Sequence, residues 1–259
     1  MSGGIAGQVG WVARRSIRRA LRQPAIVFPT IVFPLVLLAV NAPGLEEATR
    51  LPGFPTDSYL DFAIAVCFLQ GALFALTTSG TELAHDVETG FLSRLSLTPL
   101  RAVALLLGQV AGAVTVGLLG TALYITVGLI VGVSIAAGVG GVVVLFALSL
   151  LVCLCYAAIG AYMGLRTGSG EAVQGVFPLM FVVFFLSSIN LPRDLIEVDW
   201  FRTIATWNPV SYLVEAFRSL IIVGWDWGAL WRGFAVALGV LALAAAGARS
   251  ALLRRMERT

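Results

Sequence analysis

The chain has 259 residues, of which 59% are hydrophobic and only 12% are charged, and its formal net charge is +3. Charged residues make up roughly a quarter of an ordinary soluble domain, so this composition excludes one and indicates a polytopic membrane protein. The three cysteines, Cys67, Cys153 and Cys155, lie inside apolar runs without CxxC spacing, which predicts packing residues rather than a metal or redox site.

Residues 1–23 place five arginines among apolar residues, with Trp11 near the middle of the segment. This basic amphipathic pattern predicts an interface helix that lies in the cytoplasmic headgroup plane of the membrane. The alternative is the start of a signal peptide, because an apolar run follows and residues 40–42 could serve as a cleavage site. Three prolines in that run argue against cleavage, and the remaining spans pair better if this one is retained.

Six apolar segments are long enough to cross a bilayer, which takes about 20 residues per helix. The third and fourth are longer than a bilayer requires, so they should tilt or project beyond it. Both contain pairs of glycines four residues apart, such as Gly160 and Gly164, and this spacing lets helix backbones approach closely. The predicted spans are 25–42, 59–81, 102–134, 136–165, 175–191 and 229–248.

The distribution of arginine predicts the orientation of these spans. With the N-terminus inside, twelve arginines fall in cytoplasmic segments and five fall outside. Because positive residues accumulate on the cytoplasmic side, both termini are predicted to be cytoplasmic. An even number of spans agrees with this orientation.

The stretch 81–101 is the longest polar interior run, and it predicts a short amphipathic cytoplasmic helix over 86–97. Its apolar residues fall on one helical face, and Thr98-Pro99 ends it because proline cannot donate to the preceding turn. Such a helix either docks on a soluble partner or rests on the lipid headgroups.

The segment 192–224 is neither a span nor an ordinary loop, because an apolar run in it is interrupted by Glu215 and Arg218. These two residues are three apart, so they could pair on one helical face. Several tryptophans crowd the same region, as is typical of a membrane interface. We expect two short re-entrant helices that dip into the outer leaflet with their charges turned into protein or water. A plain extracellular hairpin on the headgroups is the alternative.

The sequence lacks the GxSxG, GxxxxGK[ST] and HExxH patterns, and its one histidine, His85, has no neighbouring cysteine or second histidine. This predicts a chain that is not an enzyme and has no nucleotide, zinc or other cofactor site of its own. The spans also lack a mid-bilayer charge of the kind that ion-coupled transporters need. If the protein moves a substrate, the energy should come from elsewhere.

Two motifs resemble one family, the membrane subunits of ABC-2 type exporters, in particular the bacterial drug and lipid permeases of the daunorubicin-resistance type. Residues 86–99 are similar to the family's cytoplasmic loop, with its acidic-x-Glu-x-Gly start and closing proline. Residues 204–218 resemble its Asn-Pro signature, which continues through a tyrosine to Glu-Ala-x-Arg. The resemblance extends over essentially the whole chain and implies a single all-α membrane domain in residues 1–259.

The resemblance also implies roles for the two motifs. The helix 86–97 would be a coupling helix on a separate ABC ATPase that holds ATP and magnesium, and 192–224 would form an outer gate. A second copy or a related permease and membrane lipids would be partners, with no nucleic acid, in a bacterial plasma membrane. The predicted coupling residues are His85, Asp86, Glu88, Gly90, Phe91, Leu92, Arg94 and Leu95, and the gate residues are Pro192, Asn208, Pro209, Tyr212, Glu215 and Arg218.

Phenylalanines recur on the first, second and fifth spans, which would line a path between two protomers. Aromatic side chains there favour a hydrophobic or amphipathic cargo, such as a drug, a lipid or a lipid-linked molecule, exported with energy from the ATPase. The alternatives are a membrane anchor that does not transport and an ATP-driven sodium-extruding permease. The predicted path residues are Phe28, Phe33, Phe74, Phe177, Phe181 and Phe184.

Overall fold

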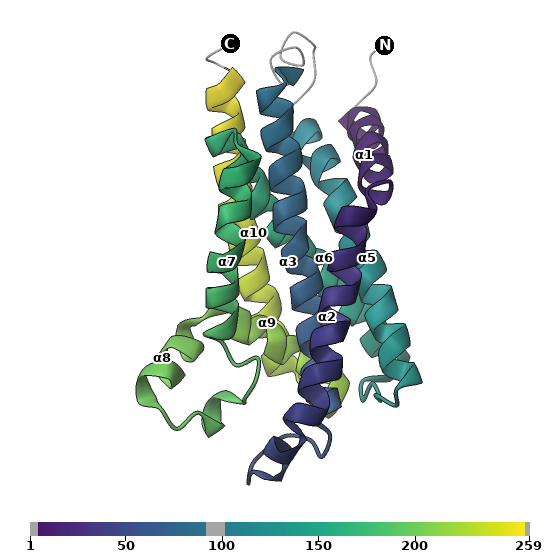
Figure 1. The fold of residues 1–259 in the computed structure, drawn as a ribbon, viewed down its shortest axis with the longest axis vertical. Helices are drawn as coiled ribbons and strands as arrows, with labels where there is room; N and C mark the ends of the chain where they lie inside the picture. The colour runs from purple at the N-terminus through teal and green to yellow at the C-terminus, as the bar shows by residue number, and fades with distance from the viewer. Residues whose placement is uncertain (1–4, 92–101, 257–259) are drawn as a thin grey trace.

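The computed structural model describes residues 5–91 and 102–256, and within these ranges the chain is helical, with turns and loops but no strand. Figure 1 shows long helices running side by side, with α8 set apart from the bundle at one end. The helices are α1 (Ile5–Leu21), α2 (Pro24–Gly44), η1 (Glu46–Arg50), α3 (Tyr59–Glu88), α5 (Ala102–Ile130), α6 (Gly138–Thr167), α7 (Gly170–Phe185), η2 (Arg193–Leu195), α8 (Asp199–Trp207), α9 (Pro209–Arg218), η3 (Ser219–Val223) and α10 (Trp227–Met256).

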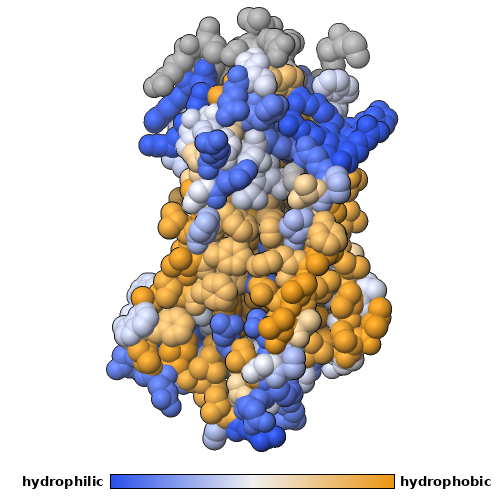
Figure 2. All heavy atoms as spheres, viewed as in Figure 1, coloured by the Kyte–Doolittle hydropathy of each residue, from blue (hydrophilic) through white to orange (hydrophobic). Residues whose placement is uncertain are grey.

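Five of these helices, α2, α3, α5, α6 and α10, are long and apolar enough to cross a membrane. The apolar α7 has only 16 residues, fewer than the usual 20 for a crossing. Figure 2 shows a hydrophobic surface band between two hydrophilic ends of the molecule. The predicted all-α polytopic architecture is therefore confirmed. We call the end that holds α1 and the last turns of α10 the α1 end, and the opposite end the α8 end.

Several predicted boundaries are wrong because local backbone geometry ends or extends the helices. The third span stops at Ile130 rather than 134, since Gly132 takes a positive φ of 101° and turns the chain. The fifth predicted span, 175–191, corresponds to a helix that begins at Gly170 and ends at Phe185, so residues 186–191 are not helical. The second continues to Glu88, which means that no separate helix begins at 86.

The helix α3 lies at the centre of the bundle, where it packs against α2, α5, α6, α7 and α9. Its closest neighbour is α6, and glycine makes this approach possible. A Cβ atom added at Gly160 would overlap the Leu76 carbonyl, and one at Gly164 would overlap the Gly80 carbonyl. The glycine spacing of the fourth span thus marks a close helix contact, as the sequence predicts.

The N-terminal helix α1 does not stand alone, because it packs along the start of α5. Gly108 and Gly112 of α5 face Val12 and Ser16 of α1 so closely that no side chain would fit at either glycine. One face of α1 is therefore held against protein, while Trp11 on another face is 70% exposed.

Candidate functional site

A cluster of buried charged and polar groups joins α1, α3 and α5 at the α1 end. Asp86 is only 2% exposed and lies 3.2 Å from Arg15 and 3.8 Å from Arg19, both of which belong to α1. The Gln109 side chain of α5 also donates a hydrogen bond to Asp86. Because a buried carboxylate needs such partners, these contacts lock three helices together.

Glu82, one turn before Asp86, extends the same cluster into the bundle. It is 5% exposed, accepts a hydrogen bond of 3.4 Å from the Ser16 hydroxyl and lies 4.0 Å from Arg19. Ser16 also lies 2.7 Å from the Gln109 carbonyl oxygen. A movement of α1 would thus be transmitted directly to the central helix.

This placement changes the role predicted for Asp86, since its carboxylate faces α1 rather than a docking surface. His85 and Glu88 are exposed, and Gly90, in the turn that follows α3, has a positive φ of 64°. Phe91 is half-buried, and the Arg15 guanidinium carbon lies 4.1 Å from its ring centre. The remaining predicted coupling residues, Leu92, Arg94 and Leu95, lie outside the described residues.

At the α8 end, the Asn208-Pro209 motif fastens α9 to the end of α7. The Asn208 side chain accepts a hydrogen bond of 2.9 Å from the Val210 amide and so caps α9, with Pro209 at its first position. The same side chain donates to the Val183 and Leu186 carbonyls at 2.6 and 3.1 Å. Asn208 therefore binds carbonyls at the C-terminal end of α7 and also caps the N-terminus of α9.

Arg218 is 6% exposed and holds the non-helical segment that follows α7. Its guanidinium donates to the backbone carbonyls of Phe62, Ser188 and Ile189, and it lies over the Phe62 ring at 3.4 Å. Arg218 thus satisfies carbonyls of the non-helical segment, while Asn208 binds the Val183 and Leu186 carbonyls at the end of α7.

The predicted pair of Glu215 with Arg218 is wrong, since Glu215 pairs with Arg193. Ser188 also donates to Glu215 at 3.1 Å, and the Arg193 guanidinium carbon lies 4.6 Å from the Tyr212 ring centre. Partial burial lowers the pKa of Arg193, but its interactions with Glu215, and then with Tyr212, together outweigh the burial and raise the pKa above its usual value. Arg193 therefore keeps its positive charge beside Glu215.

Five of the six predicted path residues form one chain of ring contacts between α2, α3 and α7. Phe33 contacts Phe74 and Phe181 at centroid distances of 6.0 and 5.9 Å, and Phe177 lies 5.3 Å from Phe74 and 5.0 Å from Phe181. Phe184 extends the chain at 6.2 Å from Phe181. The sixth, Phe28, is 66% exposed.

Several residues of the cluster around Asp86 at the α1 end, and of the contacts around Arg218 and Glu215 at the α8 end, were not predicted from the sequence. Arg15 and Arg19 are four residues apart on α1, so their common face could have been read from the sequence. Gln109 and Ser188 offered no comparable signal, because their partners are distant along the chain.

These features, several long apolar helices around a buried central helix with a polar cluster at each end, define a multi-pass helical membrane protein. The family model described as ABC-2 type transporter matches residues 7–222. The chain belongs to the ABC-2 type transporter family.

Two similar proteins come from Mycobacterium tuberculosis, strains CDC 1551 / Oshkosh and ATCC 25618 / H37Rv. Each is named "Probable doxorubicin resistance ABC transporter permease protein DrrC". Each is 21% identical over 210 residues, which cover 81% of this chain and 75% of the relative.

Proposed function

We propose that the chain is the permease subunit of an ATP-driven exporter that moves a hydrophobic or amphipathic substrate out across the bacterial plasma membrane. The observation that carries this proposal is the family match over residues 7–222. A separate ATPase subunit that binds ATP and magnesium supplies the energy, and two permease chains meet in the membrane. The similar mycobacterial proteins, named for doxorubicin resistance, support a drug-like cargo.

In the proposed topology the chain crosses the membrane six times, with the short α7 as the fifth crossing. The α1 end faces the cytoplasm, so both termini are cytoplasmic, in agreement with the arginine distribution. The helices α8 and α9 form the re-entrant pair at the outer side. Exposed Trp200 and Trp207 on α8 support a place at the membrane interface.

The coupling route begins at the segment that follows α3. The ATPase docks there, and Phe91 transmits its movement because the ring contacts Arg15, which is paired with Asp86. A displacement at Phe91 thus reaches α1 and the central helix together. The path for the substrate runs along the ring contacts between α2, α3 and α7, whose aromatic surface suits an apolar cargo.

Replacing Phe91 with aspartate tests this route. In the complex with its ATPase, we expect the substrate-stimulated rate of ATP hydrolysis to fall about tenfold, because an apolar anchor in such an interface contributes about 1.4 kcal/mol or more. Basal hydrolysis by the ATPase should remain. The measurement is the rate with and without an amphipathic compound in nanodiscs.

Leu253→Asp is the matched control, since Leu253 is an apolar residue near the α1 end and 40% exposed. It should leave the stimulation intact. An unchanged stimulated rate in a well-folded Phe91→Asp complex would refute the coupling route.

A further inference from the structure

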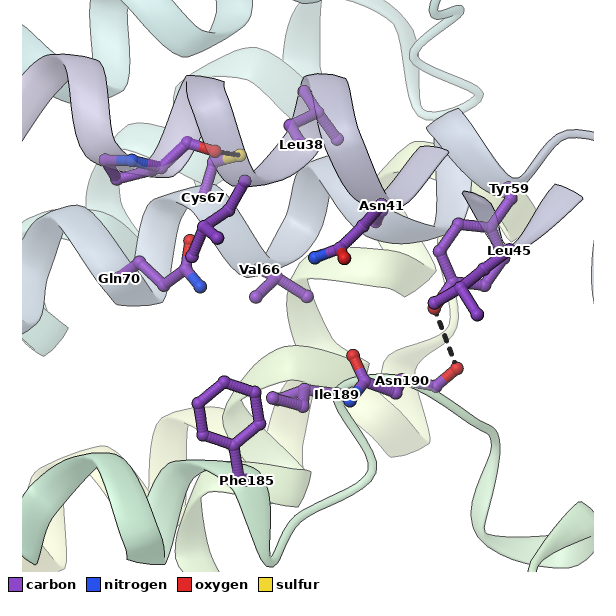
Figure 3. Close-up of a pocket in the computed structure, with 13 residues that line it drawn as sticks. Leu38, Asn41, Leu45, Tyr59, Val66, Cys67, Gln70, Phe185, Ile189 and Asn190 are labelled. Atoms are coloured by element: carbon purple, nitrogen blue, oxygen red, sulfur yellow. Dashed lines mark hydrogen bonds between the residues drawn. The ribbon is translucent and has the colours of Figure 1, made fainter. Parts of the chain in front are cut away.

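A cavity of about 170 Å³ lies between α2, α3 and the segment that follows α7. Its polar lining comes from the side-chain amides of Asn41, Gln70 and Asn190, one from each of these three parts of the chain. Figure 3 shows the three amides around the hollow, with Phe185 and Ile189 on one side of it. The Tyr59 hydroxyl closes one end by donating a hydrogen bond of 2.9 Å to the Asn190 carbonyl.

The three amides have unused hydrogen-bonding capacity. Within the described ranges 5–91 and 102–256, none of the three side chains hydrogen-bonds to another residue. Gln70 is only 4% exposed, so bulk water reaches it poorly. An amide in such a place needs a partner that both donates and accepts, and hydrocarbon chains of lipid offer neither.

The cavity also extends well into the membrane-spanning region. Asn41 lies near the end of α2, whereas Gln70 lies eleven residues after the start of α3, about 16 Å along that helix. Leu38 and Val66 add apolar walls between them. An occupant must therefore combine polar atoms with an apolar body.

Among the described residues that line the cavity, none carries a charge. A charged group would lose its water here without gaining a counter-ion, which strongly disfavours its entry. A cavity of about 150 Å³ accommodates a benzene-sized ring. Size and lining together fit an uncharged ring with hydroxyl or carbonyl groups.

We propose that this cavity binds the uncharged, hydroxyl- or carbonyl-bearing ring of an amphipathic molecule, with the amides of Asn41, Gln70 and Asn190 as its hydrogen-bond partners. This inference rests on the proposed function, because it places part of the exported substrate beside the aromatic path. It adds a selection rule, which is that a neutral polar ring is accepted and a charged head is refused.

The test uses the full chain in nanodiscs without any ATPase. Three photoactivatable probes share one alkyl chain but carry a glucoside, a sulfate or a trimethylammonium head. Cross-linked peptides are mapped by mass spectrometry, and unlabelled octyl glucoside serves as the competitor. We expect only the glucoside to label the walls of the cavity on α2 and α3 in a saturable and competed manner.

Two variants and one control sharpen the result. Gln70→Leu and Asn41→Leu should each raise the half-saturating concentration of the glucoside probe about fivefold or more, because each removes one hydrogen-bonding amide. Asn41 is partly exposed, so its variant remains informative if Gln70→Leu folds poorly. Gln174→Leu removes an exposed amide of α7 outside the cavity and should change nothing.

Equal labelling by the three probes, or glucoside labelling that both variants leave unchanged, would overturn the proposal. Absence of saturable labelling would mean that water alone fills the cavity, which also overturns it. Because no ATPase is present, these outcomes are independent of the coupling route. Failure of the Phe91→Asp experiment would in turn leave the binding result intact.

Discussion

Replacing Arg218 with methionine should lower the stability of the folded protein by about 4 kcal/mol, because three buried carbonyl groups lose their donor and each such loss costs about 1–3 kcal/mol. Methionine fills most of the same volume, so the effect reports the lost hydrogen bonds rather than a void. The midpoint of thermal unfolding in detergent should fall by about 10 °C. Size-exclusion chromatography after heating measures this shift.

Arg232→Met provides the matched control. The Arg232 side chain is exposed and donates to the Gly228 carbonyl of its own helix at 3.0 Å. Its removal should change stability by less than about 0.5 kcal/mol. Equal midpoints for the two variants would show that Arg218 does not hold the segment after α7.

Replacing Asp86 with leucine should cost about 3 kcal/mol, because it breaks a buried ion pair and strands the Gln109 amide. The loss stays near the lower end of the range for such pairs, since the Arg15 side chain is 32% exposed and its charge can be hydrated. Proteolysis between α1 and α2 should become faster as α1 detaches. Limited digestion of the protein in nanodiscs measures this rate.

Glu88→Leu removes a carboxylate from the same end of α3, but Glu88 is exposed. It should leave both the digestion rate and the unfolding midpoint close to those of the unmodified protein. Identical behaviour of the two leucine variants would refute the role of Asp86 as the anchor of α1.

Much of the fold could be predicted because a membrane span is a contiguous run of apolar residues, which can be recognised locally in the sequence. The presence of α3, α6 and α10 followed from such runs, although α3 and α10 both extend beyond their predicted spans, and the glycine pair at Gly160 and Gly164 predicted a close helix contact. The end of α7 could not be predicted in this way. The predicted span includes residues 186–191, but their carbonyls are bound by Asn208 and Arg218, which are distant in sequence.

The site shows the same division between local and distant information. The Asn208-Pro209 cap is local and could be recognised from two adjacent residues. Asp86 belongs to an amphipathic pattern that predicts an exposed carboxylate, yet its partner Arg15 lies 71 residues away. Likewise, Glu215 pairs with Arg193 across the loop rather than with its helical neighbour. Single-sequence patterns carry no signal for such distant pairs.

The central claim is that this permease is driven by a separate ATPase, and co-purification with a candidate ABC ATPase tests that claim most directly. We expect a stable complex with two copies of each chain, in which an amphipathic compound changes the rate of ATP hydrolysis. Failure to form a complex with any ATPase, under conditions where the permease alone stays folded, would contradict the claim and favour a membrane anchor that does not transport.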